Sequence, residues 1–203
     1  VNSTNSVQQL ERLQRRVIQC RLCPRLVRWR EKVARDKVKR FADQRYWGKP
    51  IPGFGDPEAR LLLVGLAPAA HGGNRTGRMF TGDNSGNWLY RALHKAGFAN
   101  QPDATDRFDG LTLRDCYITA TLRCAPPLNR PARREVLNCR PYLLQEIACL
   151  GNVRVVVGLG RIGFDAALQA FGATTKNAFR RKPKFFHGAL YNFGGIAFIA
   201  SFH

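Results

Sequence analysis

Four short apolar runs, separated by stretches with helical spacing, constrain the fold of this chain more than any other feature. The runs cover residues 61–64, 117–122, 153–159 and 196–202. Their length and their bounding glycine and proline residues are typical of buried strands. Apolar residues recur at helical spacing at 10–17, 88–96, 136–150 and 162–171. Strands alternating with helices in this way predict a three-layer α/β/α sandwich with a short, mainly parallel four-stranded central sheet.

The carboxyl ends of the predicted strands locate a candidate site. In parallel α/β sheets, ligands bind at this edge, where the loops that leave the strands meet. Segments 65–83 and 123–129 each follow a predicted strand, and His203 follows the last one. We therefore expect the candidate functional residues to come from these three places.

The size and composition of the chain predict one domain over residues 1–203. A chain of 203 residues with 44% hydrophobic content can build a single continuous core. The last apolar run stops directly before His203, and domains seldom end inside their core. We therefore expect this sequence to be a truncated form of the natural chain, with residues missing beyond His203.

The charge of the chain favours a polyanionic partner. Lys and Arg total 33 against 14 Asp and Glu, and such an excess suits nucleic acid better than an anionic membrane. No apolar run reaches the roughly 20 residues that span a bilayer, and the polar start does not resemble a signal peptide. We expect a cytoplasmic protein whose nucleic-acid contacts include Arg75, Arg130, Arg180, Arg181 and Lys182.

Four of the six cysteines have the spacing of a metal site. Cys20 and Cys23 form a C-x2-C pair, and Cys124 and Cys139 form a second pair about a hundred residues downstream. In a reducing compartment such pairs are better explained by metal ligation than by disulfides. Four buried thiols remain the alternative, and spacing does not separate zinc from an iron–sulfur cluster. The other two cysteines stand among apolar neighbours and are predicted to be core residues.

A glycine-rich loop follows the first predicted strand and precedes a helix. Its sequence over residues 65–83 is GLAPAAHGGNRTGRMFTGD. Glycines allow the backbone to approach a ligand closely. The segment lacks the Gly-Lys-Ser/Thr ending of a nucleoside triphosphate loop, so it is either a binding loop of another kind or a purely structural one.

Four motifs together resemble one known family. The glycine-rich loop, CRLCPRLVRWRE, RCAPPLNRP and the terminal ASFH look like segments of the family 5 (type b) uracil-DNA glycosylases, the iron–sulfur members of the uracil-DNA glycosylase superfamily in bacteria and archaea. The likeness runs from about Cys20 to His203, and the motifs occur in the right order. It implies a 4Fe-4S cluster on Cys20, Cys23, Cys124 and Cys139.

The resemblance also implies roles for residues around a flipped base. Phe80 matches the aromatic residue that stacks on the base, and Asp83 matches a carboxylate that activates water or stabilises the cationic sugar. Asn129 matches a catalytic asparagine, and His203 matches a histidine that hydrogen-bonds uracil. The remaining residues expected to bind the base are Gly65, Ala67, Ala69 and His71.

These residues also have ordinary structural interpretations. Asp83 stands where it would cap a helix that begins near Asn84. Phe80 alone would more often be a core residue, and Asn129 lies between prolines as turn residues do. His71 either lines the pocket or hydrogen-bonds within its loop.

The function implied by the resemblance is the first step of base-excision repair in a prokaryote. A monomeric enzyme, associated with the nucleoid, would flip uracil out of uracil-containing DNA and hydrolyse its N-glycosidic bond. Leu66 and Ala67 stand where other branches carry a polar residue, so hypoxanthine or xanthine are further expected substrates. Two alternatives remain: a non-catalytic module that binds damaged DNA, and a zinc-stapled RNA-binding domain.

Overall fold

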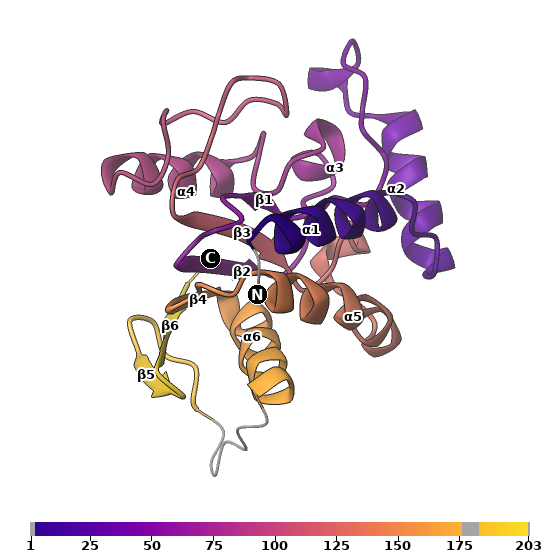
Figure 1. Ribbon diagram of the computed structural model, residues 1–203. Helices are drawn as coiled ribbons and strands as arrows, with labels where there is room; N and C mark the ends of the chain where they lie inside the picture. The colour runs from indigo at the N-terminus through magenta and orange to yellow at the C-terminus, as the bar shows by residue number, and fades with distance from the viewer. Residues whose placement is uncertain (1–2, 176–182, 203) are drawn as a thin grey trace.

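A six-stranded sheet forms the centre of the molecule (Figure 1). The computed structural model describes residues 3–175 and 183–202. The strand order is β1-β3-β2-β4-β6-β5. The strands are β1 (Phe54–Gly55), β2 (Leu61–Gly65), β3 (Cys116–Ala120), β4 (Val155–Leu159), β5 (Leu190–Phe193) and β6 (Ile196–Ser201).

The four predicted strands are confirmed as the parallel centre of this sheet. β3, β2, β4 and β6 are parallel neighbours, whereas β1 and β5 add antiparallel edges. The predicted count of four was wrong because both edge strands lack a buried-strand pattern. β1 has only two residues, and β5 alternates between exposed and half-buried positions.

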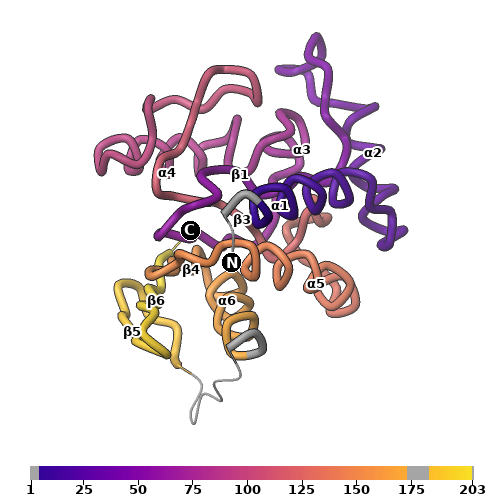
Figure 2. The backbone as a smooth tube through the Cα atoms, viewed as in Figure 1, coloured from indigo at the N-terminus to yellow at the C-terminus, as the bar shows by residue number. Residues whose placement is uncertain are grey.

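Helices cover both faces of the sheet, which confirms the predicted α/β/α sandwich. The helices are α1 (Ser3–Ile18), α2 (Pro24–Asp36), α3 (Gly73–Thr76), α4 (Asn84–Lys95), α5 (Arg133–Cys149) and α6 (Gly160–Thr175), with 3-10 turns at Lys39–Phe41 and Pro127–Asn129. Figure 2 shows α4 and α6 on opposite sides of the strands. α5 and α1 continue the layer of α6, since α1 packs on α5 and α5 on α6.

The continuous apolar runs are explained by two hydrophobic clusters, one on each face. Leu62 and Val64 of β2 belong to the cluster beneath α6, which includes Phe164. Leu63, between them, belongs to the cluster beneath α4, together with Tyr90. Because side chains alternate across a strand, a strand buried on both sides needs an apolar residue at every position.

The face that α4 buries differs from the predicted stripe. Leu93 of that stripe is buried, but Trp88 is 78% exposed, and the other buried residues are Gly86 and Tyr90. A Cβ atom on Gly86 would overlap the carbonyl oxygen of Phe80, so the helix touches the loop at this glycine. Positions four and seven residues further on then face the core.

Candidate active site

A cavity of about 1140 Å³ opens at the carboxyl ends of the parallel strands. Residues 66–69 follow β2, Asn129 lies in the segment after β3, and residues 159–162 continue from β4. The cavity therefore lies where the sequence predicted a site. Of the predicted residues, the cavity walls contain Ala67, Ala69, Arg75, Phe80, Asp83 and Asn129.

Phe80 is held against the end of β2 by a strained backbone. Its φ angle of 51° lies in the left-handed region, which a bulky residue adopts only when its surroundings impose it. A Cβ atom on Gly65 would lie 2.6 Å from the Cζ of Phe80, so the ring rests where Gly65 has no side chain. Phe80 is 9% exposed, and it belongs both to the core and to the cavity wall.

Asp83 caps α4 and faces the cavity at the same time. Its Oδ1 accepts a hydrogen bond of 3.0 Å from the amide of Gly86, which is the N-cap geometry expected from the sequence. Its Oδ2 lies so close to Gly72 that a Cβ atom there would overlap it. The two interpretations of Asp83 are therefore compatible, because one oxygen caps the helix while the side chain lines the cavity.

Asn129 reaches the rim of the cavity from a tight turn. Leu128 and Asn129 have φ angles of 53° and 55°, and the amide of Asn129 donates to the carbonyl of Pro126 at 3.2 Å. Two successive left-handed residues turn the chain sharply between the prolines. Asn129 and Leu128 are both exposed, so the turn presents them to solvent.

His71 belongs to the glycine-rich loop but is not among the residues that line the cavity. Its Nδ1 is 2.9 Å from the hydroxyl of Tyr46. Burial, and then the charges of Arg40 and Arg75, lower the pKa of His71. The lowered pKa favours the neutral ring, which shares this hydrogen bond with the Tyr46 hydroxyl. The side chain of His71 thus makes a hydrogen bond, as the second interpretation expected, but its partner Tyr46 lies outside the loop of residues 65–83.

Arg75 connects the glycine-rich loop with the segment that follows α2. It donates to the carbonyl oxygens of His71 and Gly82, each at 2.8 Å, and to the side chain of Gln44 at 2.5 Å. Its guanidinium also stacks 3.9 Å from the ring centroid of Phe41. These contacts hold the glycine-rich loop against the segment after α2.

A buried ion pair joins the glycine-rich loop to the segment that contains Asp109. Arg78 forms two hydrogen bonds with Asp109, at 2.8 and 2.6 Å, and both side chains are almost fully buried. Asp109 also accepts from the backbone of Thr105 and Leu111. Despite its burial, the pKa of Asp109 is lowered strongly by Arg78 and these amides. The pair fixes residues 104–106, which line the cavity.

The four paired cysteines line one small pocket of about 20 Å³. Arg30 donates to the Sγ of Cys124 at 2.9 Å, and the amide of Arg123 donates to the Sγ of Cys139 at 3.3 Å. Burial raises the pKa of Cys124 to about 11 and that of Cys139 to about 12. Within the described residues, no group of three or more His, Cys, Asp or Glu has the geometry to hold a metal ion.

Arg123 connects the cysteine pocket to the interior. Its guanidinium pairs with the fully buried Glu146 of α5, at 2.5 Å between Nη2 and Oε2. Glu146 also accepts from Thr119 at 2.6 Å and from the amide of Gly53 at 3.2 Å. Burying both charges without these bonds would be costly. Neither charged residue was predicted, because no local pattern reveals a partner 23 positions away.

The remaining predicted residues fall in three groups. Arg130 is exposed beside Asn129, and Cys116 and Cys149 pack into or against the core as expected. Arg180, Arg181, Lys182 and His203 lie outside the described residues. Cavity residues that the sequence did not single out include Arg40, Phe41, Gln44, Ser85, Asn87, Ala104, Thr105, Asp106 and Arg161. Arg40 stands in a stretch rich in Arg and Lys, residues 28–40, and this local charge is the signal that the sequence offers.

Comparisons with known proteins agree on one family. Residues 52–203 match the uracil DNA glycosylase superfamily. A type-5 uracil-DNA glycosylase of Mycobacterium tuberculosis is 50% identical over 186 residues, which are 91% of this chain and 68% of that protein. The type-5 enzyme of Thermus thermophilus is 50% identical over 91% of this chain and 81% of its own length. That of Pyrobaculum aerophilum is 45% identical over 93% and 79%.

Proposed function

Because this chain belongs to the uracil DNA glycosylase superfamily, we propose that its large cavity receives a uracil flipped out of DNA and that the protein hydrolyses the N-glycosidic bond. The observation that carries the proposal is that Phe80, Asp83 and Asn129 line the same cavity. An aromatic face, a carboxylate and an amide are the groups that base flipping and charge separation require together.

The reaction separates charge, and the cavity offers a group for each part. As the bond between base and sugar breaks, negative charge develops on the base and positive charge on the deoxyribose. Phe80 stacks on the base, Asn129 donates a hydrogen bond to it, and His203 is proposed as a second donor. Asp83 stabilises the sugar and accepts the proton of the water whose oxygen bonds to the sugar carbon.

The cavity also supports a wider choice of base. Leu66, Ala67, Pro68 and Ala69 form its wall at the end of β2, so this wall has no polar side chain that would reject a purine. We therefore propose hypoxanthine and xanthine as additional substrates.

The cofactor that we propose is a 4Fe-4S cluster on Cys20, Cys23, Cys124 and Cys139. In such a cluster each thiolate binds its own iron, so the four sulfurs need not converge on one ion. The N–H groups aimed at the sulfurs of Cys124 and Cys139 are the donors that thiolate ligands use. The cluster would supply a structural clip between the start of α2 and α5.

The proposed setting is the prokaryotic cytoplasm, with the protein acting as a monomer on nucleoid DNA. The three relatives named above come from bacteria and an archaeon. Among the described residues, no helix combines the length and apolar character needed to cross a membrane.

Base release is the direct test. We expect the protein to release uracil from a uracil-containing duplex, seen as strand breaks at the uracil after alkali, and to act also on hypoxanthine. Asp83→Asn should lower kcat by roughly 100-fold or more, because asparagine keeps the helix cap but removes the charge.

The matched control is Asp36→Asn, which removes a carboxylate from the end of α2 and should leave kcat unchanged. A wild-type protein that binds the duplex but releases no base would identify a non-catalytic damage-binding module instead.

A further inference from the structure

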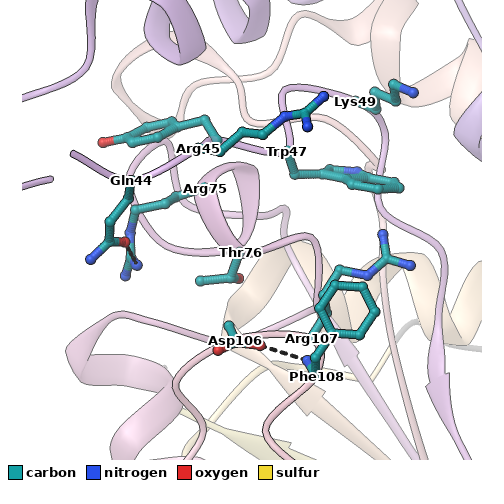
Figure 3. Close-up of a pocket in the computed structure, with 10 residues that line it drawn as sticks. Gln44, Arg45, Trp47, Lys49, Arg75, Thr76, Asp106, Arg107 and Phe108 are labelled. Carbon is teal, nitrogen blue, oxygen red and sulfur yellow. Dashed lines mark hydrogen bonds between the residues drawn. The ribbon is translucent and has the colours of Figure 1, made fainter. Parts of the chain in front are cut away.

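A second cavity adjoins the candidate active site. It has a volume of about 650 Å³, and Gln44, Arg75 and Asp106 line both cavities. Figure 3 shows Trp47 and Lys49 on one side and Arg107 and Phe108 on the other, with the guanidinium of Arg107 turned toward the Trp47 ring. We call this cavity the flank pocket. A nucleic-acid strand that enters the candidate active site can therefore continue into the flank pocket.

The flank pocket gathers positive charge that the protein does not neutralise. Arg45, Lys49 and Arg107 line it and are all exposed. In the part of the chain that the structure describes, none of the three forms an ion pair. The one carboxylate in the lining, Asp106, accepts from the amide of Phe108 at 2.6 Å. Such an arrangement favours an anionic ligand.

Aromatic rings accompany these charges. The guanidinium of Arg107 lies 4.3 Å from the ring centroid of Trp47 and 4.7 Å from that of Phe108. The two rings thus hold the cation in place while Phe108 remains 83% exposed. Exposed aromatic rings beside fixed cations are the combination with which proteins bind bases and phosphates of an unpaired strand.

We propose that the flank pocket binds the nucleotide next to the flipped uracil on the same strand. This inference rests on the proposed function, since it assumes that the uracil occupies the main cavity. The neighbouring base stacks on Phe108, and its phosphate meets Lys49 and Arg107. A protein partner would suit this pocket less well, because its apolar surface is interrupted by cations.

The test combines a variant of the pocket with substrates that lack one neighbour. Phe108→Ala and Lys49→Gln are introduced together, and KM is measured on three duplexes. In the first duplex the strand that contains uracil is continuous. The other two are gapped duplexes, in which that strand lacks the nucleotides either on the 5′ side or on the 3′ side of the uracil. We expect KM on the continuous duplex to rise at least about fivefold with kcat unchanged, and the effect to vanish on one of the gapped duplexes, which identifies the side.

Two results would overturn the inference: an unchanged KM on the continuous duplex, or an increase that persists on both gapped duplexes. The matched control, Phe186→Ala with Lys95→Gln, removes an exposed ring and charge outside both cavities. Dissociation constants of the same duplexes, measured in an Asp83→Asn background, test the pocket separately from base release. A wild-type protein without base release would refute the proposed function, while these constants would still decide the inference.

Discussion

Gly72 illustrates how one residue without a side chain positions a candidate catalytic group. A Cβ atom at this position would overlap Oδ2 of Asp83. We expect Gly72→Ala to displace that carboxylate and to lower kcat for base release at least about tenfold, because small misplacements of reacting groups are costly. Affinity for DNA should change little. Single-turnover kinetics and fluorescence anisotropy measure the two quantities.

Gly151→Ala provides the matched control, since a Cβ atom there would meet nothing within 4 Å. Wild-type kcat in the Gly72→Ala protein would show that the close approach to Gly72 does not set the position of the carboxylate.

At the scale of elements, the cysteine pocket brings the start of α2 next to α5. Cys23 precedes α2, whereas Cys139 lies within α5. If these residues hold a 4Fe-4S cluster, Cys139→Ser should abolish the absorbance shoulder near about 400 nm that such clusters give. The melting temperature should then fall by about 5 °C or more, because the clip is lost.

Cys149→Ser is the comparison for this prediction, because Cys149 packs against the core and does not line the cysteine pocket. Iron analysis completes the experiment. Stoichiometric zinc without iron in the wild-type protein would contradict the proposed cofactor.

At the scale of the whole molecule, the net charge of +19 should dominate affinity for DNA. Each phosphate contact releases counterions, so a plot of log Kd against log salt concentration should have a slope of several units. Arg161→Gln, at the rim of the cavity, should reduce that slope by about one unit. Anisotropy titrations at several salt concentrations measure both slopes, and a flat response would contradict DNA binding through phosphates.

The sequence by itself determined the features that are written in local patterns. Continuous apolar runs specified the parallel strands, because a strand buried on both faces needs an apolar residue at every position. Asp83 before α4 specified a helix cap, because a carboxylate satisfies the free amides of a first turn. The four motifs specified the family, and with it the residues Phe80 and Asn129 that line the cavity.

Only the tertiary structure decided features that depend on distant contacts. The face that α4 buries follows from the contact of Gly86 with Phe80, and helical spacing alone does not reveal it. The hydrogen bonds of Arg75 to Gln44 and to backbone carbonyls also join segments that no local pattern connects. The flank pocket forms where Trp47 and Arg107, 60 positions apart in the sequence, come into contact. Such contacts depend on how the whole chain packs, and no local pattern encodes them.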